Sequence, residues 1–235
     1  YYIQMYKDKF KEHFIEIKLV IVEELENMEQ YVKCNKVDFA INRSRNHIMG
    51  ELLEQKGVRV FNSSSVTRIA NNKGITYEFL KDVVPFLAVK YGNEIIESKI
   101  ENKGFEYPYV IKSCSGHGGS QVFLVNNSKE EQAVKAMNGQ EYVVQQCCSD
   151  LGRDVRVYVI GNKIIKAVLR TSTESFKSNY SLGGKVQEYT LNNEEKAMVE
   201  RIVDKLPLDY AGIDFTFNNG KAVFNEIEDA VGARM

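Results

Sequence analysis

Two alternating segments near the end of the chain, AGIDFTF and KAVFNEI, constrain the fold more than any other feature. Apolar and polar residues alternate in each segment, and the Asn219-Gly220 pair between them is a favoured hairpin turn, so we expect a β-hairpin. Successive side chains of a strand point to opposite faces of the sheet. Glu226 and Glu228 are therefore expected to lie on one face of this hairpin.

Whether Asp214 joins that face depends on the register of the hairpin. A two-residue Asn-Gly turn would place Asp214 on the opposite face, whereas a three-residue loop with Gly220 in the left-handed conformation brings the three carboxylates together. In that second register four apolar residues face the core: Ile213, Phe215, Val223 and Ile227. Three carboxylates on one face repel each other unless a cation lies among them, and their hard oxygens suit Mg²⁺ or Mn²⁺. An acidic, exposed sheet surface without a metal is the alternative that the hairpin alone leaves open.

The composition of the 235-residue chain is ordinary for a soluble globular protein, with 43% hydrophobic and 27% charged residues. The 31 Lys and Arg residues are balanced by 32 Asp and Glu residues and are dispersed along the chain, so nucleic acid is not an expected partner. No apolar run approaches the roughly 20 residues of a membrane span, and no signal peptide opens the chain. A cytoplasmic location without membrane contact is therefore expected.

The cysteines and histidines form no recognisable metal motif. The chain has four cysteines: Cys34, Cys114, Cys147 and Cys148. They lack CxxC spacing, so reduced structural thiols are expected, and a soft-metal site at the adjacent pair is the alternative. Of the three histidines, only His117 lies in a glycine-rich loop and is a functional candidate.

The first 70 residues alternate between helix-like and strand-like stretches. We expect helices at 4–14 and 47–56 and strands at 15–22 and 37–42. Such alternation indicates a small α/β domain with a parallel sheet and flanking helices. This first domain is expected to span residues 1–70.

Two further regions are expected, at residues 71–146 and 147–235. The first contains strands expected at 107–112, 120–125 and 141–146 and helices expected at 72–82, 91–103 and 128–138. The second contains two antiparallel strands joined by Gly161-Asn162, a helix expected at 192–205 and the carboxylate hairpin. The charged segment that ends at Met235 is expected to continue into a further strand or helix.

A glycine-rich loop, SCSGHGGS, follows a strand that ends in Lys112. It is not a Walker A loop, because no Lys-Ser/Thr pair follows the glycines and no helix begins there. Gly116, Gly118 and Gly119 nevertheless allow backbone N–H groups to approach an anion closely, as a lid over phosphates requires. A plain glycine-rich hairpin beside a snorkelling lysine is the alternative.

The order of lysine, glycine loop and carboxylate hairpin resembles that of ATP-grasp proteins, and the chain is most similar to RimK-type carboxylate–amine ligases. The motifs that carry the resemblance are VIKSCSGHGGSQVFLV, EYVVQQ, GRDVRVYVIG, FKSNYSLGG, AGIDFTF and FNEIEDAVG, preceded by INR, FNSS and NNKGITYEFL. The resemblance covers nearly the whole chain and is strongest from 107 to 235. It implies an α/β (α+β) ATP-grasp fold, in which the N-terminal α/β domain precedes two α+β subdomains that clasp ATP.

The resemblance implies an ATP-dependent ligase with two Mg²⁺ (or Mn²⁺) ions. ATP would convert a carboxylate into an acyl phosphate, and an amine would then displace phosphate to form a C–N bond. The implied partners are small-molecule or peptide carboxylates and amines. An ATP-grasp phosphotransferase and a non-catalytic ATP-binding protein are the alternatives, and a homo-oligomer is compatible with the sequence.

Residue by residue, the resemblance implies a nucleotide site and a metal site. The ATP-binding positions would be Lys73 and Lys112 at the phosphates, Ser115, Gly116, Gly118 and Gly119 in the lid loop, Gln145, Gln146 and Cys147 at the strand-edge hinge beside adenine, Asp154, and the segment Lys177, Ser178 and Asn179. The metal ligands would be Asp214, Glu226 and Glu228. This metal role requires the register with the three-residue turn.

The candidate catalytic residues are Arg170, Lys177 and Asn179. Arg170 ends an antiparallel strand and could stabilise the transferring phosphoryl group, with an ordinary strand-end arginine as the alternative. Lys185 and Arg234 are candidates for neutralising an acidic substrate. The chain departs from the family pattern at three positions, with Glu228 in place of Asn, Gln146 in place of Glu and Lys177 in place of Arg.

Overall fold

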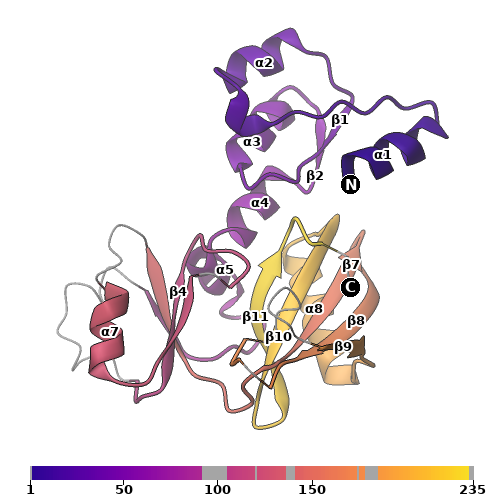
Figure 1. Cartoon of the computed structure of the whole chain (residues 1–235). Coiled ribbons are helices and arrows are strands. Elements are labelled where there is room, and N and C mark those ends of the chain that lie inside the picture. The colour runs from indigo at the N-terminus through magenta and orange to yellow at the C-terminus, as the bar shows by residue number, and fades with distance from the viewer. Residues whose placement is uncertain are drawn as a thin grey trace.

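A computed structural model of the chain describes residues 2–91, 105–119, 121–135, 141–173, 175–177 and 185–232. Within these residues the chain forms an N-terminal domain and two antiparallel sheets below it (Figure 1). The expected helix at 91–103 lies almost entirely outside the described residues. Across the described part of the chain, no helix is both long and apolar enough to cross a membrane.

The N-terminal domain is built around a two-stranded parallel sheet. Its elements are α1 (Tyr2–Lys11), a 3₁₀ turn η1 (Val22–Glu24), α2 (Met28–Cys34), β1 (Phe39–Ile41), α3 (His47–Gln55), β2 (Arg59–Phe61) and α4 (Ser64–Ala70). Ala40 of β1 pairs with Val60 of β2 in parallel. Val32, Met49 and Leu53 pack with Val60 in a small separate core. The parallel pair agrees with the α/β alternation of the sequence.

The prediction of a strand at residues 15–22 is wrong. Residues 15–21 have no regular secondary structure, and the chain enters η1 at Val22. The side chains of Leu19 and Ile21 are 56% and 44% exposed. An alternating apolar pattern becomes a strand only when a sheet edge offers hydrogen-bond partners, and β1 pairs with β2 rather than with this segment.

A four-stranded antiparallel sheet, which we call the lid sheet, forms the second part of the fold. It follows helix α5 (Lys73–Leu80) and contains β3 (Val89–Tyr91), β4 (Tyr109–Ser113), β5 (Val122–Val125) and β6 (Tyr142–Gln146), with helix α7 (Ser128–Lys135) on one side. The strand order is β3-β6-β4-β5, so β6 is a central strand. Tyr109, Ile111 and Val144 pack with Val125 and Val134 in a second core.

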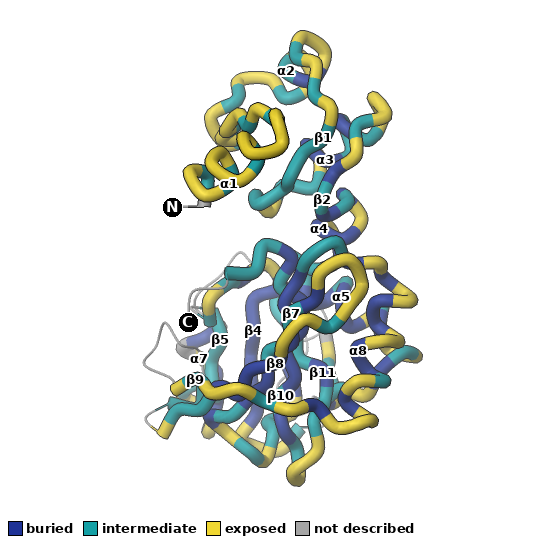
Figure 2. The backbone as a smooth tube through the Cα atoms, turned by 90° about the vertical axis from the view of Figure 1, so that its right-hand side faces the viewer, coloured by how far each residue is buried: buried dark blue, intermediate teal, exposed yellow. Residues whose placement is uncertain are grey.

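A five-stranded antiparallel sheet carries the C-terminal half. It contains β7 (Arg153–Ile160), β8 (Lys163–Thr171), β9 (Lys185–Glu188), β10 (Tyr210–Asn218) and β11 (Lys221–Glu228), in the order β11-β10-β7-β8-β9. Helix α8 (Asn193–Lys205) packs on this sheet, and its start is fixed by a capping box between Asn192 and Glu195. Figure 2 shows buried backbone in strands of both antiparallel sheets, β4 among them, whose residues are all buried.

The turn of the β10–β11 hairpin has two residues, so the three-residue turn that we expected is wrong. Asn218 pairs with Lys221, which leaves Asn219 and Gly220 as the turn, with φ angles of 51° and 72°. Positive φ at both positions is the conformation of a type I′ turn, which Asn-Gly favours. This turn alone would separate Asp214 from the two glutamates.

A β-bulge restores the shared face. Phe215 pairs with Phe224, but the next residue of β10, Asp214, pairs with Glu226, so Asn225 is an extra residue in β11. Glu226 therefore lies directly opposite Asp214. The bulge also corrects the expected core, because Phe224 is fully buried where Val223 was expected.

Asn62 fastens the N-terminal domain to the end of this hairpin. Its side-chain oxygen accepts hydrogen bonds from the backbone N–H groups of Asp209 and Tyr210 at 2.9 and 3.1 Å. Its Nδ2 donates to the backbone oxygens of Tyr210 and Asp229 at 2.7 and 3.0 Å. Arg43 adds bonds from Nη2 to the oxygens of Ala230 and Val231. Asn62 is 0% exposed, so these backbone groups depend on a buried amide.

Replacing Asn62 by leucine is expected to lower the free energy of unfolding by about 2–4 kcal/mol, because a side chain of similar size leaves buried backbone groups without partners. Denaturant unfolding measures the change. Asn35→Leu is the control, because Asn35 bonds only one carbonyl oxygen of its own helix, that of Tyr31. Equal losses in the two variants would contradict the role of Asn62.

Candidate active site

Asp214 is the most buried carboxylate of the hairpin face and is held by two arginines. Its side chain is 1% exposed. Arg156 donates from Nε to Oδ1 and from Nη2 to Oδ2, both at 2.7 Å, and Arg170 donates from Nη2 to Oδ2 at 2.7 Å. Burial raises the pKa of Asp214, but the two guanidinium groups outweigh it and lower the pKa to about 2. Asp214 is therefore a permanent anion at neutral pH.

Arg170 is held from the other side by Asp154. Its Nε and Nη2 donate to Oδ1 and Oδ2 of Asp154 at 2.5 and 2.9 Å, and the two residues pair across β7 and β8. Burial lowers the pKa of Arg170, and the carboxylates of Asp214 and Asp154 raise it further than burial lowers it. The charges of Asp154, Arg156, Arg170 and Asp214 thus balance within the sheet.

Glu226 and Glu228 are the more exposed carboxylates of the face, with side chains 36% and 42% exposed. Nη2 of Arg156 lies 2.6 Å from Oε2 of Glu228, so Arg156 bridges Glu228 and Asp214. Gly212, which pairs with Glu228, leaves room for this bridge, because a Cβ there would lie 3.3 Å from Cδ of Arg156. Burial raises the pKa of Glu228, and Arg156 partly offsets it.

Two buried lysines face these carboxylates. Lys112, on β4 and 7% exposed, donates from Nζ to Oδ1 of Asn225 at 2.7 Å. Lys73, the first residue of α5 and 8% exposed, lies 3.8 Å from Oε2 of Glu226. Burial lowers the pKa of Lys112 to about 8, with Glu226 opposing the shift and Lys73 adding to it. Lys112 thus links its sheet to the C-terminal sheet through Asn225, and Lys73 brings the start of α5 next to Glu226.

The glycine loop is tied back by two lysines. Nζ of Lys73 donates to the carbonyl oxygen of Gly116 at 2.6 Å, and Nζ of Lys177 donates to that of Gly119 at 2.5 Å. Gly118 and Gly119 have φ of 60° and 74°, a conformation that glycine adopts readily. Ser115 is exposed at the loop. Ser178 and Asn179, which the resemblance placed beside the phosphates, lie outside the described residues.

His117 of the same loop is half-buried. Burial lowers its pKa to about 4, and the positive charges of Arg45 and Lys73 add to this shift. His117 is therefore neutral at pH 7. A neutral imidazole at this position can donate or accept a hydrogen bond but adds no charge to the site.

The expected adenine hinge lies at the end of the central strand β6. Gln145 is 2% exposed, its backbone pairs with both β3 and β4, and its Nε2 donates to the hydroxyl of Tyr77 at 3.0 Å. The backbone N–H of Gln146 donates to Ala88. Gln145 and Gln146 thus belong to the end of β6 and Cys147 directly follows it, so their contact with adenine stays a prediction. Burial, followed by the neighbouring Cys148, raises the pKa of the Cys147 thiol to about 11.

The structure brings together seven of the candidates from six helices and strands: Lys73, Lys112, Asp154, Arg170, Asp214, Glu226 and Glu228. Lys185 lies exposed on β9, and Arg234 is outside the described residues. Sequence reasoning missed Arg156 and Asn225. Arg156 could have been found, because it stands two residues after Asp154 in the same predicted strand and so shares its face.

The hard oxygens of this face fit Mg²⁺ or Mn²⁺ in chemical type. Oδ1 of Asp214 accepts a hydrogen bond from Nε of Arg156, and a carboxylate oxygen has a second lone pair to offer. Among the described residues, however, no group of three His, Cys, Asp or Glu side chains is arranged to hold a metal ion. Arg156 lies between Asp214 and Glu228 instead, so its guanidinium occupies part of the space that a metal ion would need.

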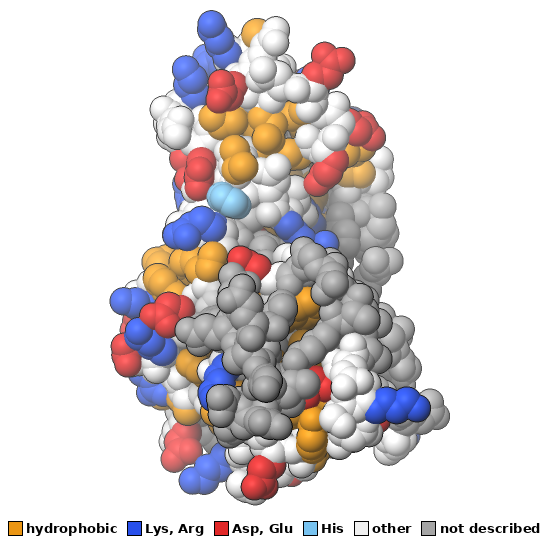
Figure 3. All heavy atoms as spheres, turned by 90° about the vertical axis from the view of Figure 1, so that its left-hand side faces the viewer, with side chains coloured by type: hydrophobic (Ala, Val, Ile, Leu, Met, Phe, Trp, Pro, Cys, Tyr) orange, Lys and Arg blue, Asp and Glu red, His pale blue; other side chains and the backbone are white. Residues whose placement is uncertain are grey.

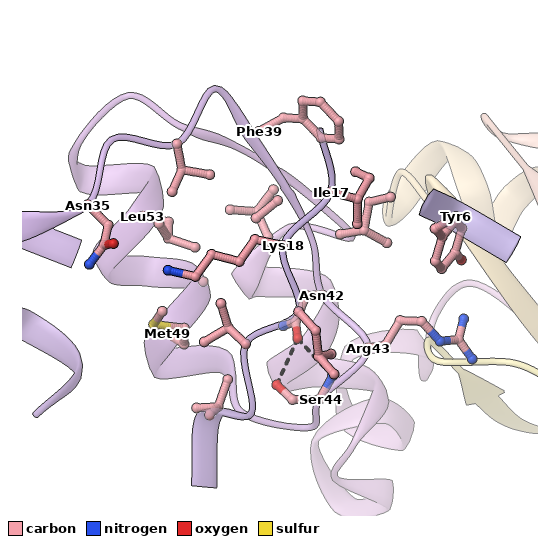
Figure 4. Close-up of a pocket in the computed structure, with 18 of the residues that line it drawn as sticks. Tyr6, Ile17, Lys18, Asn35, Phe39, Asn42, Arg43, Ser44, Met49 and Leu53 are labelled. Carbon is pink, nitrogen blue, oxygen red and sulfur yellow. Dashed lines mark hydrogen bonds between the residues drawn. The ribbon is translucent and has the colours of Figure 1, made fainter. Parts of the chain in front are cut away.

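A cavity of about 1120 Å³ opens in the N-terminal domain (Figure 4). Residues 14–23 and 35–45 line it, together with Leu53 and Ala230. Its walls are mostly apolar, and Lys18, Asn42 and Ser44 add polar groups, with Asn42 and Ser44 joined by a hydrogen bond. Ala230 is two residues from Glu228, so one end of the cavity lies within about 8 Å of the carboxylate hairpin along the backbone.

The outer surface of the molecule carries charges of both signs. On the face seen in Figure 3, Lys and Arg side chains are interspersed with Asp and Glu side chains. Hydrophobic side chains are also visible over the N-terminal domain in that view. The described surface in this view therefore shows no basic stripe.

The two clasping sheets, with lysines and carboxylates facing each other, form an ATP-grasp fold. A solved structure of a RimK domain ATP-grasp protein from Sphaerobacter thermophilus matches with a TM-score of 0.77 at 22% identity, covering 98% of this chain and 88% of that one. The family model of the RimK-like ATP-grasp domain matches residues 37–235. The chain belongs to the RimK-like ATP-grasp family.

Two relatives illustrate this membership. The uncharacterized protein MG011 of Mycoplasma genitalium is 34% identical over 217 residues, which are 92% of this chain and 74% of that protein. Human beta-citrylglutamate synthase B is 31% identical over 170 residues, which are 69% of this chain and 44% of the synthase. The expected fold and family are thus confirmed.

Proposed function

We propose that this protein is an ATP-dependent carboxylate–amine ligase that works through an acyl phosphate. The observation that carries the proposal is the placement of two buried lysines, Lys73 and Lys112, beside the carboxylates of Glu226 and Asp214. Buried ammonium groups are costly unless they meet an anion, and a polyphosphate provides one. The kinship with a synthase of beta-citrylglutamate supports a ligase rather than a simple nucleotide binder.

The proposed reaction activates a poor electrophile. A substrate carboxylate oxygen attacks the γ-phosphorus of ATP and the bond to ADP breaks, which forms the acyl phosphate. An amine nitrogen then attacks the carbonyl carbon, inorganic phosphate leaves and the amine loses a proton. Such phosphoryl transfer needs positioning and charge neutralisation more than covalent help.

Lys73 and Lys112 would contact the phosphates from the two sides of the glycine loop, since Lys73 already bonds the backbone of Gly116. Glu226 and Glu228, with Asp214, would hold Mg²⁺ or Mn²⁺, which supplies further neutralisation of phosphate charge. Arg156 would then leave Glu228 and become available to the transferring group. Arg170, bonded to both Asp154 and Asp214, would fix the orientation of Asp214.

The N-terminal cavity is our candidate for the site of the carboxylate or amine substrate. Its volume of about 1120 Å³ exceeds the roughly 300–1,000 Å³ of common small-ligand sites. Its end at Ala230 adjoins the proposed metal ligands. A substrate with an apolar body and a polar end directed toward the hairpin would suit these walls.

ADP release is the test of the proposal. With Mg²⁺, ATP and a pool of amino acids and short peptides, we expect ADP release that requires both a carboxylate and an amine, and an amide product visible by mass spectrometry. Amine-independent ADP release would favour a phosphotransferase. Magnesium-dependent stabilisation by ATP without any ADP release would favour a non-catalytic ATP-binding protein.

Replacing Glu228 by asparagine is expected to raise the half-saturating Mg²⁺ concentration about tenfold, because one anionic ligand becomes neutral while an oxygen remains. Thermal-shift titration with Mg²⁺ at fixed ATP measures the change. Glu188→Gln is the matched control, since the Glu188 side chain is 75% exposed on the outer strand β9. An unchanged Mg²⁺ requirement in Glu228→Asn would remove Glu228 from the proposed ligand set.

A further inference from the structure

We propose that Asn225 is a positioning residue that aims the ammonium of Lys112 at the nucleotide phosphates. This role rests on the proposed function, because it assumes that Lys112 contacts phosphate. It assigns a purpose to the β-bulge in β11, which neither the hairpin pattern nor the resemblance predicted.

The bulge places the Asn225 side chain where a regular strand would not. Asn225 is the extra residue between Phe224, which pairs with Phe215, and Glu226, which pairs with Asp214. Phe224 is fully buried and Glu226 faces the carboxylate cluster, so the chain must change faces between them without the usual alternation. Asn225 is the unpaired residue at which β11 changes faces, and its side chain contacts Lys112.

The contact with Lys112 is short and links the two sheets. Oδ1 of Asn225 on β11 accepts from Nζ of Lys112 on β4 at 2.7 Å. Lys112 is 7% exposed, so little water is available to solvate its ammonium group. An amide oxygen satisfies one of the three ammonium protons without cancelling the positive charge. The positive charge of Lys112 therefore stays available to a phosphate. A carboxylate partner in place of the amide would partly neutralise that charge.

The backbone of Asn225 is also held in place. The Tyr77 hydroxyl donates to the carbonyl oxygen of Asn225 at 2.7 Å and accepts from Nε2 of Gln145 at 3.0 Å. Tyr77 lies on α5, the helix that begins at Lys73, and is 1% exposed. The bulge is thus fixed from α5 and β6, and Asn225 in turn fixes the direction of Lys112.

Two substitutions of nearly equal shape separate this role from packing. Asn225→Leu removes the acceptor, and Asn225→Asp keeps an acceptor oxygen but adds a negative charge. In nucleotide-free protein at pH 8, we expect acetic anhydride to acylate Lys112 several-fold faster in Asn225→Leu, because the charged amine loses a partner, and several-fold slower in Asn225→Asp. Residue-resolved mass spectrometry measures the rates. Asn126→Leu is the control, because Asn126 is exposed and lies outside this contact, and its rate should resemble that of the wild type.

The same variants are then titrated with ATP and Mg²⁺ by calorimetry. We expect about tenfold weaker binding in both Asn225 variants, with melting temperatures close to the wild type. Changes of acylation rate in the same direction in both variants, or unchanged ATP affinity in Asn225→Leu, would overturn the positioning role. Wild-type protein that binds no ATP would overturn the proposed function and this role together, whereas opposite acylation shifts would still establish the link between Asn225 and Lys112.

Discussion

Replacing Lys112 by methionine is expected to lower kcat/KM for ATP by about 10²–10³-fold, the usual loss when one preorganised cationic or hydrogen-bonding group is removed from a transferring group. Methionine nearly matches the length of the lysine stem, so the β4 core at Ile111 and Tyr109 should be retained. Because a buried ammonium is costly, the melting temperature should stay the same or rise. Steady-state ADP release and thermal unfolding together measure the two effects.

The pH dependence of ATP affinity provides a second test of the role of Lys112. Burial lowers the pKa of Lys112 to about 8, so in the free protein the ammonium is lost as pH rises through about 8. ATP affinity should therefore fall above that pH in the wild type, and this fall should be absent in Lys112→Met. Lys163→Met, at an exposed strand end, is the control. Undiminished thermal stabilisation of Lys112→Met by ATP would contradict the proposal that Lys112 contacts the phosphates of ATP.

Replacing Asp214 by asparagine is expected to lower the free energy of unfolding by about 3–5 kcal/mol, the usual cost of removing one partner of a buried ion pair. Arg156 and Arg170 both donate to this carboxylate, and the substitution leaves two guanidinium groups with less counter-charge. Magnesium-dependent binding of ATP should be lost in the same variant. Denaturant unfolding and calorimetry measure the two changes.

Asp214 also predicts a specific acid sensitivity. Its folded pKa of about 2 lies below the roughly 3.9 of an unfolded aspartate, so its stabilisation is present above the unfolded value and is lost as pH falls toward about 2. The loss of stability over that window should be smaller in Asp214→Asn. The exposed Asp204 of α8 supplies the control Asp204→Asn. Identical acid unfolding in wild type and Asp214→Asn would contradict the depressed pKa.

The hairpin was predictable because its signal is local. Alternation and the Asn-Gly pair are enough to specify two strands and a turn, and the even spacing of Glu226 and Glu228 places them on one face. The face of Asp214 was predicted correctly, but from a three-residue turn that the structure does not have. An odd-length turn and a bulge give the same face at Asp214, and alternation cannot distinguish them. Only the pairing of Phe224 with Phe215 reveals which device is used.

The remaining differences come from partners distant in sequence. Residues 15–21 carry a strand pattern, but whether a strand forms depends on a free sheet edge elsewhere in the domain. Arg156 was passed over because an arginine in an apolar strand has many ordinary explanations until Asp214 and Glu228 are found beside it. The family resemblance supplied Lys73, whose link to Glu226 spans most of the chain.

The hydrogen bonds of Asn62 and Arg43 to the end of the hairpin have a mechanical consequence. They tie the wall of the N-terminal cavity to the segment that directly follows Glu228. A rotation of the lid sheet that admits a nucleotide would therefore leave the spacing between the cavity and the carboxylates unchanged. The cavity and the carboxylates would keep their relative positions, and the sheet that carries Lys112 would bring the nucleotide to them.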